Sequence, residues 1–393
     1  MRILQVLPYF SPSMGGVARV VFDLARHLSY RGHDVTVVAG DYKQAEASFP
    51  PDEFRQVLLR SVFSRWGFYY TPSLVAWMRD HVTEFDVIHL HEVRTFQNAV
   101  ARRFALRHNV PYVLSAHGTL PVIVQRKLAK RAYDLFFGRA LLASASRLVA
   151  VSPLEAEQYR QIGGAEASRV RVIYNGLDLD EFCHLPPRGL LRQKLGIPLQ
   201  APVVLFLGRL HRIKGVDHLL QSFARLGEEV PEAILVIAGP DEGELAHLQA
   251  LARRLRLVDR VQFAGPLYGQ DKLSAYVDAD VVASPGGYEI FGLVPFEALM
   301  CGTPVVVSDG GGANQLIWES GSGYLVPYGD VPALTAVLRQ ALTDSAAAMR
   351  QVEAGLKFVR TTLDWRVITI RVEALYAEVA GSGAACPCGF VTH

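Results

Sequence analysis

The sequence predicts an α/β protein with two Rossmann-like, doubly wound parallel-sheet domains that face a central cleft. The first observation is the length of 393 residues, because a single hydrophobic core rarely grows so large. The second is the alternation of short β-rich runs with helix-length segments, which is typical of parallel sheets covered by helices on both faces. The third is that this alternation stops near the middle of the chain and then starts again.

The apolar runs give the expected strands. In the first half they cover 3–7, 35–39, 87–90, 112–115 and 147–151, and in the second 203–207, 234–238, 261–264, 281–284 and 304–308. Nearly every residue in these runs is apolar, as in strands buried on both faces. The carboxyl ends of parallel strands meet at one edge of a sheet, where open α/β sheets bind their ligands.

A stretch rich in Pro and Gly separates the two halves. The expected organisation is an N-terminal domain, a linker with a short helix, a C-terminal domain, a closing helix that packs back on the N-terminal domain, and a flexible tail. These parts are assigned to 1–182, 183–200, 201–360, 361–380 and 381–393.

The composition excludes several classes of protein. With 40 basic and 38 acidic residues the net charge is +2, so we expect no nucleic-acid partner. The cysteines are too few and scattered for a disulfide framework, which suits a reducing cytosol. Cys386 and Cys388 could bind a metal only with partners that the sequence does not show.

The hydropathy pattern addresses the membrane. No apolar window approaches the roughly 18 residues that span a bilayer, and the first apolar run, which ends at Pro8, is too short for a signal peptide. We therefore expect a cytoplasmic protein, or one peripheral to the inner face of the cytoplasmic membrane.

Two carboxylates bracket a glycine turn late in the chain. Glu289 and Glu297 flank a helix start expected near Gly292 or Leu293, and the first N–H groups of a helix can meet an anion. Carboxylates repel phosphate, so these two fit hydrogen bonding to sugar or ribose hydroxyls better. An acidic first turn that only favours the helix macrodipole is the alternative interpretation.

Two cations follow the strand expected at 203–207. Arg209 and Lys214 lie beside a glycine turn and suit a diphosphate, although a basic surface loop would look the same. Together with the helix start near Gly292 they can neutralise a dianionic leaving group without a metal. Neither a GxxxxGK[ST] loop nor a G-x-G-x-x-G turn after a strand occurs, so nucleoside triphosphatase and dehydrogenase interpretations lose support.

Two Asp-x-Asp pairs could suggest metal-bound diphosphate. Asp278 and Asp280 precede an expected strand, where they are interpreted as caps or turns, and Asp178 and Asp180 lie toward the linker. We therefore expect no metal site.

These motifs resemble glycosyltransferase family 4, and the resemblance extends over nearly the whole chain. The turn from Gly208 to Gly215 and the segment from Glu289 to Leu299 are its specific parts. Weaker matches are Gly15-Gly16, 86–91, 116–119, Ser152, 175–178, 302–305 and Trp365. The resemblance implies a retaining, nucleotide-sugar-dependent enzyme that makes polysaccharide, glycolipid or another glycoconjugate.

The resemblance implies roles for the charged residues. Arg209 and Lys214 would grip the diphosphate, Glu297 the ribose hydroxyls and Glu289 a hydroxyl of the donor sugar. His117 would contact the sugar near the reacting carbon. The expected catalytic set is therefore His117, Arg209, Lys214 and Glu289, with no cofactor beyond the donor substrate.

Backbone positions complete the implied donor site. N–H groups near Phe291, Gly292 and Leu293 would meet the sugar and phosphate. Gly15 and Gly16 would let the backbone approach the donor, because side chains there would intrude. Backbone around Leu267 would recognise the base of a UDP- or GDP-sugar.

One position departs from the family pattern. Gln315 stands where the family usually has a glutamate. An amide keeps a hydrogen bond but loses the charge, which puts the identity of the sugar in doubt rather than the reaction.

The mechanism that the resemblance favours is front-face attack, in which the leaving phosphate accepts the acceptor's proton. A double displacement would need a carboxylate beneath the sugar. A non-hydrolysing sugar-nucleotide epimerase and a catalytically silent sugar-nucleotide-binding protein are the alternative functions. The sequence does not identify the base, the sugar, the acceptor, the linkage or the oligomeric state.

Two further features carry open alternatives. His89 and His91 point the same way from a strand, and a structural role is favoured over a metal pair because no third ligand is evident. The basic, apolar-rich segment 120–142 is either a surface helix with one buried face or a contact with an anionic membrane that carries a lipid-linked acceptor. A sugar is the other acceptor class expected.

Overall fold

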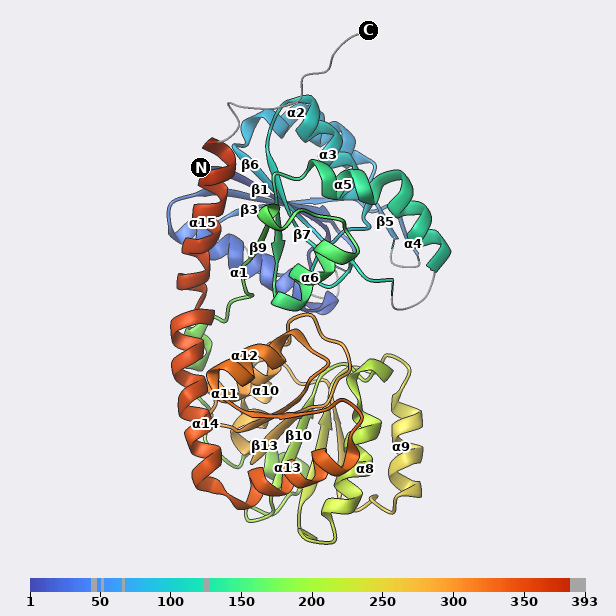
Figure 1. Ribbon diagram of the computed structural model, residues 1–393, viewed down its shortest axis with the longest axis vertical. Helices are drawn as coiled ribbons and strands as arrows, with labels where there is room; N and C mark the ends of the chain where they lie inside the picture. The colour runs from blue at the N-terminus through green and yellow to red at the C-terminus, as the bar shows by residue number, and fades with distance from the viewer. Residues whose placement is uncertain (44–47, 51–52, 66–67, 123–126, 382–393) are drawn as a thin grey trace. The chain divides into compact units, whose positions relative to one another are not determined.

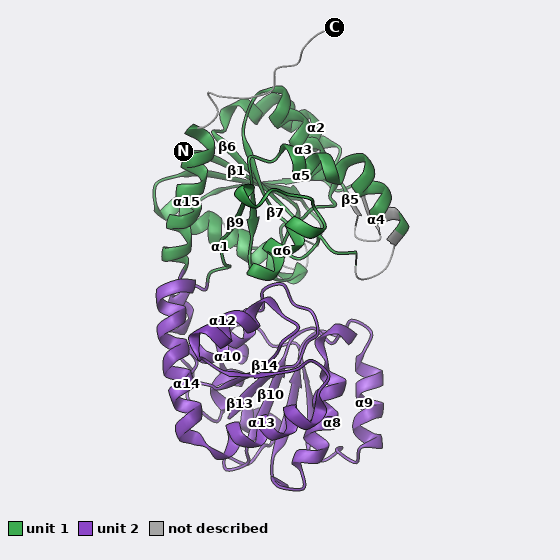
Figure 2. Cartoon of the chain, viewed as in Figure 1, with its two compact units in different colours: residues 1–176, 365–393 green, residues 177–364 purple. Residues whose placement is uncertain are grey.

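A computed structural model describes residues 1–43, 48–50, 53–65, 68–122 and 127–381, which form two compact units. Unit 1 contains residues 1–176 and the chain from Trp365 onward, and unit 2 contains residues 177–364 (Figure 2). The chain therefore leaves unit 1 after Gly176 and returns to it at Trp365. Of the tail expected at 381–393, all but Gly381 lies outside the described residues.

Unit 1 is built on a seven-stranded sheet in the order β3-β2-β1-β6-β7-β8-β9 (Figure 1). Every neighbouring pair in it is parallel. Its strands are β1 (Arg2–Tyr9), β2 (Asp34–Gly40), β3 (Arg55–Leu59), β6 (Val87–His91), β7 (Tyr112–Ser115), β8 (Arg147–Ala150) and β9 (Val170–Val172). A short antiparallel pair, β4 (Phe63–Arg65) and β5 (Phe68–Tyr70), stands apart from it.

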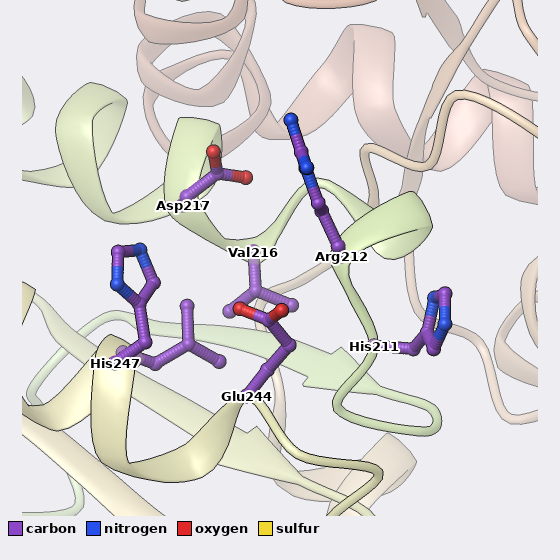
Figure 3. A pocket seen from close by; sticks show the side chains of 7 residues that line it. His211, Arg212, Val216, Asp217, Glu244 and His247 are labelled. Atoms are coloured by element: carbon purple, nitrogen blue, oxygen red, sulfur yellow. The ribbon is translucent and has the colours of Figure 1, made fainter.

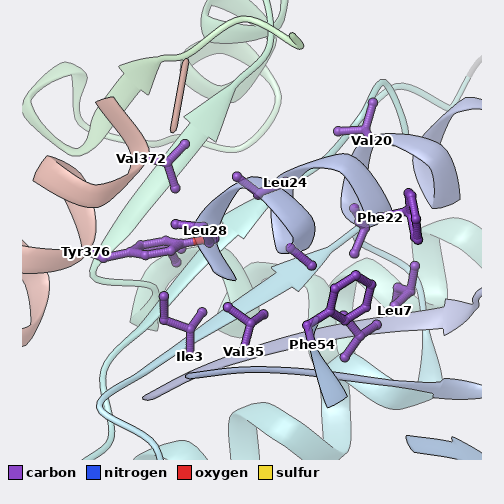
Figure 4. Close-up of a cluster of buried hydrophobic side chains, with 14 of the residues drawn as sticks. Ile3, Leu7, Val20, Phe22, Leu24, Leu28, Val35, Phe54, Val372 and Tyr376 are labelled. Carbon is purple, nitrogen blue, oxygen red and sulfur yellow. The ribbon is translucent and has the colours of Figure 1, made fainter. Parts of the chain in front are cut away.

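The sheet of unit 1 is buried on both faces because alternate side chains of a strand point to opposite faces. Ile3 and Leu7 of β1 belong to one hydrophobic cluster, and Leu4 and Val6 belong to another. The first cluster packs against α1 and α15 (Figure 4). The α-helices of unit 1 are α1 (Gly16–Tyr30), α2 (Ser73–His81), α3 (Phe96–Arg107), α4 (Lys127–Tyr133), α5 (Arg139–Ser144), α6 (Pro153–Gln161) and α15 (Trp365–Gly381), and a π-helical turn, η3 (Asp134–Gly138), joins α4 to α5.

Unit 2 is built on a six-stranded parallel sheet in the order β12-β11-β10-β13-β14-β15. Its strands are β10 (Val203–Leu207), β11 (Ile234–Ala238), β12 (Val261–Gly265), β13 (Val281–Ser284), β14 (Val305–Ser308) and β15 (Tyr324–Val326). Its α-helices are α7 (Leu190–Leu195), α8 (Val216–Leu226), α9 (Leu245–Arg254), α10 (Gly269–Asp278), α11 (Val294–Met300), α12 (Gly312–Ser320), α13 (Val331–Thr343) and α14 (Ser345–Phe358). Single turns are η5 (Leu179–Phe182), η6 (Arg212–Lys214) and the π-helical η7 (Val359–Leu363).

The stretch expected to link the two domains belongs to unit 2. It contains the short helix α7, whose Arg192 is fully buried. The Arg192 guanidinium donates hydrogen bonds to the carbonyl of Asp278 and to the carboxylate of Asp280. A buried guanidinium needs such partners, so this stretch is fastened to the body of unit 2.

The two sheets share a feature that positions ligands. In each, the strand order reverses beside the first strand, between β1 and β6 in unit 1 and between β10 and β13 in unit 2. Ligands of open α/β sheets bind outside the carboxyl ends of the strands at such a switch point. The predicted fold class, two Rossmann-like parallel-sheet domains, is confirmed.

Candidate active site

The loops after β10 and β13 meet at the switch point of unit 2, and they bring together two of the predicted residues. Lys214 Nζ lies 2.6 Å from Glu289 Oε2. The Lys214 side chain is 12% exposed and that of Glu289 is 41% exposed, so the carboxylate stays accessible to a ligand. The pair places a cation and a hydroxyl-binding acceptor side by side.

Backbone contacts between the loops hold this pair in place. The N–H of Gly287 donates to the carbonyl of Ile213 at 2.9 Å, which ties the β13 loop to the β10 loop. The N–H of Gly312 donates to the carbonyl of Glu289 at 2.6 Å, which ties the β13 loop to the start of α12. Gly215 has a φ of +66°, and a Cβ there would collide with the carbonyl oxygen of Pro285. Only glycine fits such a close crossing.

Arg209, the other predicted cation, follows the same strand. Its Nη1 lies 2.8 and 2.7 Å from the two carboxylate oxygens of Glu242, which follows the neighbouring strand β11. The Arg209 side chain is half exposed and that of Glu242 is 36% exposed. An exposed ion pair contributes little stability, so exchanging Glu242 for another anion costs little.

Glu297, predicted to bind ribose, lies in the first turn of α11. Its Oε1 lies 3.0 Å from Lys272 Nζ, and its Oε2 accepts a hydrogen bond from the Tyr276 hydroxyl at 2.6 Å. Both partners come from α10. The carboxylate is only 15% exposed, and two partners fix its orientation while leaving lone pairs for ligand hydroxyls.

The remaining predicted donor positions surround α11. The helix begins at Val294, just beyond the start expected near Gly292 or Leu293, and Leu293 is its N-cap. A Cβ at Gly292 would approach Glu289 Cδ to 3.2 Å, so the glycine leaves room for that carboxylate. Phe291 and Leu267 are buried. Both residues are expected to bind the donor through backbone groups, and burial of their side chains is compatible with that role.

A pocket of about 460 Å³ lies beside these loops (Figure 3). It is lined by residues of the loop after β10 and of the starts of α8 and α9, namely His211, Arg212, Val216, Asp217, Glu244, His247 and Leu248. None of the predicted donor-binding residues lines it. Its charges are mixed, so it has no strong preference for an anion.

In unit 1 the loop after β7 holds His117 in a strained backbone conformation. Its φ is +51°, and that of Gly118 is +79°. The buried Glu155 fixes the loop, because its Oε1 accepts the N–H of Gly118 at 2.6 Å and its Oε2 accepts the N–H of Val151 at 2.8 Å. Burial raises the pKa of Glu155 to about 7. Left-handed non-glycine residues cluster at functional sites, which favours a functional role for His117.

The two strand histidines are buried in a hydrogen-bonded network. His89 contacts the Tyr376 hydroxyl at 2.6 Å and Ser115 Oγ at 2.8 Å, while His91 contacts Gln5 and His117. Burial lowers the pKa of His89 to about 3 and that of His91 well below its usual value. Both ring nitrogens of each histidine have hydrogen-bond partners within the protein, which supports the structural interpretation of this pair.

Gly15 and Gly16 precede and begin α1 at the carboxyl end of β1. Gly15 has a φ of +100°, and a Cβ on either residue would have no neighbour within 4 Å. The conformation therefore requires glycine at Gly15. The open space fits the expected approach of a ligand to this backbone.

A carboxylate that the sequence reasoning did not single out occupies the switch point of unit 1. Glu92, directly after β6, has a φ of +63°. Its backbone is held by hydrogen bonds to the Ser115 carbonyl at 2.8 Å and from Asn98 Nδ2 at 2.8 Å. The Tyr9 hydroxyl donates to its Oε1 at 2.8 Å, and burial raises the pKa of Glu92 to about 7. The sequence did contain one hint of this residue, because Glu92 directly follows the two histidines of the strand, His89 and His91.

The Asp-x-Asp pairs have structural roles. The Asp278 carboxylate accepts the N–H groups of Gly189, Leu191 and Arg192 at the start of α7. Asp178 caps the turn η5 through the N–H of Asp180. The described ranges contain no cluster of three His, Cys, Asp or Glu side chains suited to a metal ion.

Gln315, the departure from the family pattern, lies on α12. Its Nε2 donates to Glu319 Oε1 at 2.7 Å, one helical turn further on. The charged partners Glu242 and Lys272 were also missed, because each becomes a neighbour of the site only through the order of the sheet and the packing of α10.

Sequence and structure comparisons agree on the class of protein. The family described as Glycosyltransferase Family 4 matches residues 14–181, and that described as Glycosyl transferases group 1 matches residues 187–358. Sucrose-phosphate synthase from Thermosynechococcus elongatus superposes with a TM-score of 0.79 and 25% identity over 97% of this chain and 100% of that one. The fold and the site therefore define a glycosyltransferase with the GT-B fold.

The chain belongs to glycosyltransferase family 4. It is 33% identical over 304 residues to D-inositol 3-phosphate glycosyltransferase from Xylanimonas cellulosilytica, covering 75% of this chain and 72% of the relative. It is 29% identical over 401 residues to phosphatidyl-myo-inositol mannosyltransferase from Mycobacterium leprae, covering 98% of each. Membership of this family favours a transferase over the epimerase and the silent binding protein.

A further solved structure, the Anabaena protein HepE in complex with UDP and glucose, shares the fold. Its TM-score is 0.77 at 22% identity, over 96% of this chain and 100% of that one. In the part of the chain that the structure describes, no helix is both long and apolar enough to span a membrane.

Proposed function

We propose that this protein is a retaining glycosyltransferase that moves a sugar from a nucleoside-diphosphate sugar to a hydroxyl acceptor without a catalytic metal. The observation that carries the proposal is the Lys214–Glu289 pair, 2.6 Å apart at the switch point of unit 2. A departing diphosphate needs fixed positive charge, and a sugar hydroxyl needs an acceptor. The Anabaena relative in complex with UDP and glucose supports a nucleotide-sugar donor.

The charged pairs suggest how the donor is taken up. Lys214 and Arg209 are each paired with a carboxylate that a diphosphate can replace. As the cations turn to phosphate, Glu289 is released to accept a hydrogen bond from the donor sugar. Glu297, already held by Lys272 and Tyr276, takes the ribose hydroxyls.

The proposed reaction is a front-face displacement. The bond from the anomeric carbon to phosphate breaks through an oxocarbenium-like state, and the acceptor oxygen attacks from the same face. Attack on the face that the phosphate leaves retains the configuration of the anomeric carbon. The leaving phosphate takes the acceptor's proton, so no general base from the protein is required. Under this mechanism Glu289 binds the donor, and a covalent sugar adduct on Glu289 would contradict it.

The substrates are proposed by class. UDP- or GDP-sugars are the expected donors, recognised by backbone around Leu267. The names of the relatives favour a polyol phosphate of the inositol type, free or lipid-linked, as acceptor. This choice is more specific than the sugar or lipid-linked acceptor that the sequence predicts.

Two assays in sequence test the proposal. A thermal-shift panel of UDP-, GDP- and ADP-sugars identifies the donor, since a ligand of the native state raises apparent stability. The selected donor is then incubated, with and without EDTA, with D-inositol 3-phosphate or phosphatidylinositol vesicles. NMR of the product should show the donor's anomeric configuration, unchanged by EDTA. An isomerised donor, an inverted product or loss of activity with EDTA would contradict the proposal.

A surface of unit 1 supports contact with a membrane. Leu128, Leu135, Phe136 and Phe137 are exposed by 80%, 63%, 72% and 51%. They occupy α4 and the π-helical turn after it, with Arg131 and Arg139 exposed nearby in the sequence. Such apolar exposure beside basic residues is typical of interfacial helices. Residues 123–126 of the predicted segment 120–142 lie outside the described residues.

We propose that this surface binds an anionic membrane that presents the acceptor. Sedimentation with phosphatidylcholine vesicles, with and without phosphatidylserine, measures the contact. Binding should require the anionic lipid and should fall in the double variant Phe136→Ser, Phe137→Ser. The control Tyr30→Ser, which removes an exposed aromatic ring from α1, should bind normally. Equal binding to both kinds of vesicle, or an unaffected double variant, would remove the proposal.

A further inference from the structure

A continuous line of hydrogen bonds joins the first strand of unit 1 to His117. Gln5, fully buried in β1, places its Oε1 2.6 Å from His91 Nε2. His91 Nδ1 in turn lies 2.9 Å from His117 Nε2. Within the described residues, Nδ1 of His117 has no hydrogen-bond partner, so it is the ring atom left for a ligand.

A second branch fixes the other end of the Gln5 carboxamide. Gln5 Nε2 donates to the Tyr376 hydroxyl at 3.2 Å. That hydroxyl has one proton, which it can give to His89 Nδ1 at 2.6 Å, and His89 Nε2–H then donates to Ser115 Oγ at 2.8 Å. Every contact in the branch has one donor and one acceptor.

The three histidines are uncharged, because burial lowers the pKa of His89 to about 3, that of His91 well below its usual value and that of His117 to about 4. A neutral imidazole has one N–H and one bare nitrogen. With Gln5 Oε1 as acceptor, His91 carries its proton on Nε2 and presents a bare Nδ1. His117 must then donate from Nε2.

We propose that Gln5 is a positioning residue that sets the tautomer of His117 through His91, so that His117 Nδ1 is unprotonated. A bare Nδ1 accepts a hydrogen bond from a hydroxyl of the donor sugar and cannot donate one. The use of this nitrogen rests on the proposed function, whereas the tautomer itself does not. His117 therefore favours donor sugars that place a hydroxyl group where it can donate a hydrogen bond to Nδ1.

The carboxamide orientation is the element that decides the direction of the network. If Gln5 were reversed, its NH₂ would donate to His91 Nε2, His91 Nδ1–H would donate to His117 Nε2, and His117 would carry its proton on Nδ1. The same contacts would be satisfied with every donor and acceptor exchanged. The structure assigns Oε1 to His91, and a direct measurement of nitrogen protonation separates the two directions.

The experiment is NMR of the whole protein labelled with ¹⁵N-histidine. At neutral pH the spectrum should show His117 with a pyridine-like Nδ1 and a protonated Nε2, and His91 with the same pattern. The assignment uses the loss of one signal set in His117→Asn. A protonated Nδ1 on His117, or two tautomers in similar amounts, overturns the proposal without any substrate being known.

Variants of the network add a second readout. Gln5→Met keeps the length of the side chain but removes the carboxamide, so the His117 Nδ1 signal should move toward the average of the two tautomers. Tyr112→Phe is the matched control, because it removes buried hydrogen bonds of unit 1 that lie outside this network. It should leave the His117 signals in place. If Gln5→Met does not fold, Tyr376→Phe frees the amide end of Gln5 and should broaden the same signals.

Turnover links the tautomer to the reaction. With the donor identified by the thermal-shift panel, Gln5→Met should lower kcat about tenfold while its thermal shift with UDP stays the same. Tyr112→Phe should stay within about twofold of the wild type. An unchanged kcat in a variant whose His117 signals have moved would refute the positioning role. A correct tautomer in a protein that transfers no sugar would instead refute the proposed function.

Discussion

The two candidate sites of this enzyme use opposite means to hold their polar groups. In unit 1 the groups at the strand ends are buried or partly buried, which lowers the pKa of the histidines and raises that of the Glu92 carboxyl to about 7 and so favours their neutral forms. In unit 2 each predicted cation or carboxylate stands in an ion pair. Unit 1 therefore fixes the direction of hydrogen bonds, whereas unit 2 holds charge that a ligand can redistribute.

The difference teaches where each unit is sensitive. A neutral network loses its order when one donor or acceptor is removed, because the remaining partners are left unsatisfied. An exposed ion pair such as Arg209–Glu242 contributes little stability, so breaking it mainly changes the charge that is offered to a ligand. Substitutions in unit 2 should therefore alter binding and turnover directly, whereas substitutions in unit 1 should alter stability and proton positions, and turnover only through the proton positions on His117.

The largest effect is expected at the cation of the best-formed pair. Lys214→Met should lower kcat/KM about 100-fold or more, because it removes a positive charge aimed at the leaving phosphate. Its melting temperature should change little, since Glu289 is exposed enough to be solvated. Lys194→Met, which breaks an exposed pair with Asp271, is the control and should keep full activity. A loss of less than threefold in Lys214→Met would show that unit 2 does not use this charge.

A smaller effect is expected at Glu297. The substitution Glu297→Gln keeps an acceptor for the Tyr276 hydroxyl but removes the charge paired with Lys272. Loss of a charge-assisted contact to ribose should raise the donor KM about tenfold and leave kcat within about threefold. Steady-state kinetics of Glu157→Gln, which breaks an exposed ion pair with Arg160, provides the comparison. A fall in kcat at constant KM would instead place Glu297 in the chemical step.

Unit 1 should reveal the partly buried Glu92 through the pH dependence of its stability. The pKa of Glu92 is raised to about 7 in the folded protein. Its neutral form therefore stabilises the fold fully below the unfolded pKa near 4.5, and this contribution is lost as the pH rises through 7. Glu92→Gln should match the wild type at pH 4.5 and be about 1 kcal/mol more stable at pH 8.

Calorimetry at the two pH values measures this. The difference corresponds to a rise of about 2–4 °C in Tm at pH 8 only. Glu166→Gln, on the surface of the same unit, should show no such divergence. Divergence in the opposite direction would mean that the Glu92 charge is stabilised by neighbours. The histidines affect stability at acidic pH instead. Their pKa values are lowered in the folded protein, so the free energy of unfolding decreases as the pH falls below about 6.5.

The smallest effect is a gain of affinity. Glu242 competes with a diphosphate for Arg209 in the free enzyme, so Glu242→Gln should tighten UDP binding about threefold. Isothermal titration calorimetry gives the Kd directly. Glu229→Gln, which frees Arg339 elsewhere on unit 2, should leave the Kd unchanged. Weaker binding in Glu242→Gln would mean that the carboxylate orients Arg209 for the ligand.

Much of the fold could be predicted from the sequence because strands of a buried parallel sheet consist of nearly continuous runs of apolar residues. Every predicted strand is present, with bounds shifted by no more than a residue or two. The strands that were missed are short or lie at an edge, as β3, β9 and β15 do. Strand β3 has no fully buried residue, and the β9 sequence is interrupted by Arg171. Without a buried run there is no periodic signal.

The candidate site was predictable to the extent that its residues follow strands directly. Lys214 and Glu289 do so, and the structure brings them together. Lys272 comes from the exposed side of a helix pattern and reaches Glu297 only because α10 packs beside α11. The link from Gln5 through His91 to His117 depends on the pairing of β1, β6 and β7, which no local pattern contains.

The return of the chain to unit 1 has a consequence for synthesis. Trp365 packs against Gly176, where an added Cβ would lie 2.5 Å from the indole, and Tyr376 completes the core and the network around Gln5. Unit 2 is continuous in the chain and can fold as it leaves the ribosome. Unit 1 begins first, but its core is complete only once α15 has been made, so we expect unit 1 to finish folding after unit 2.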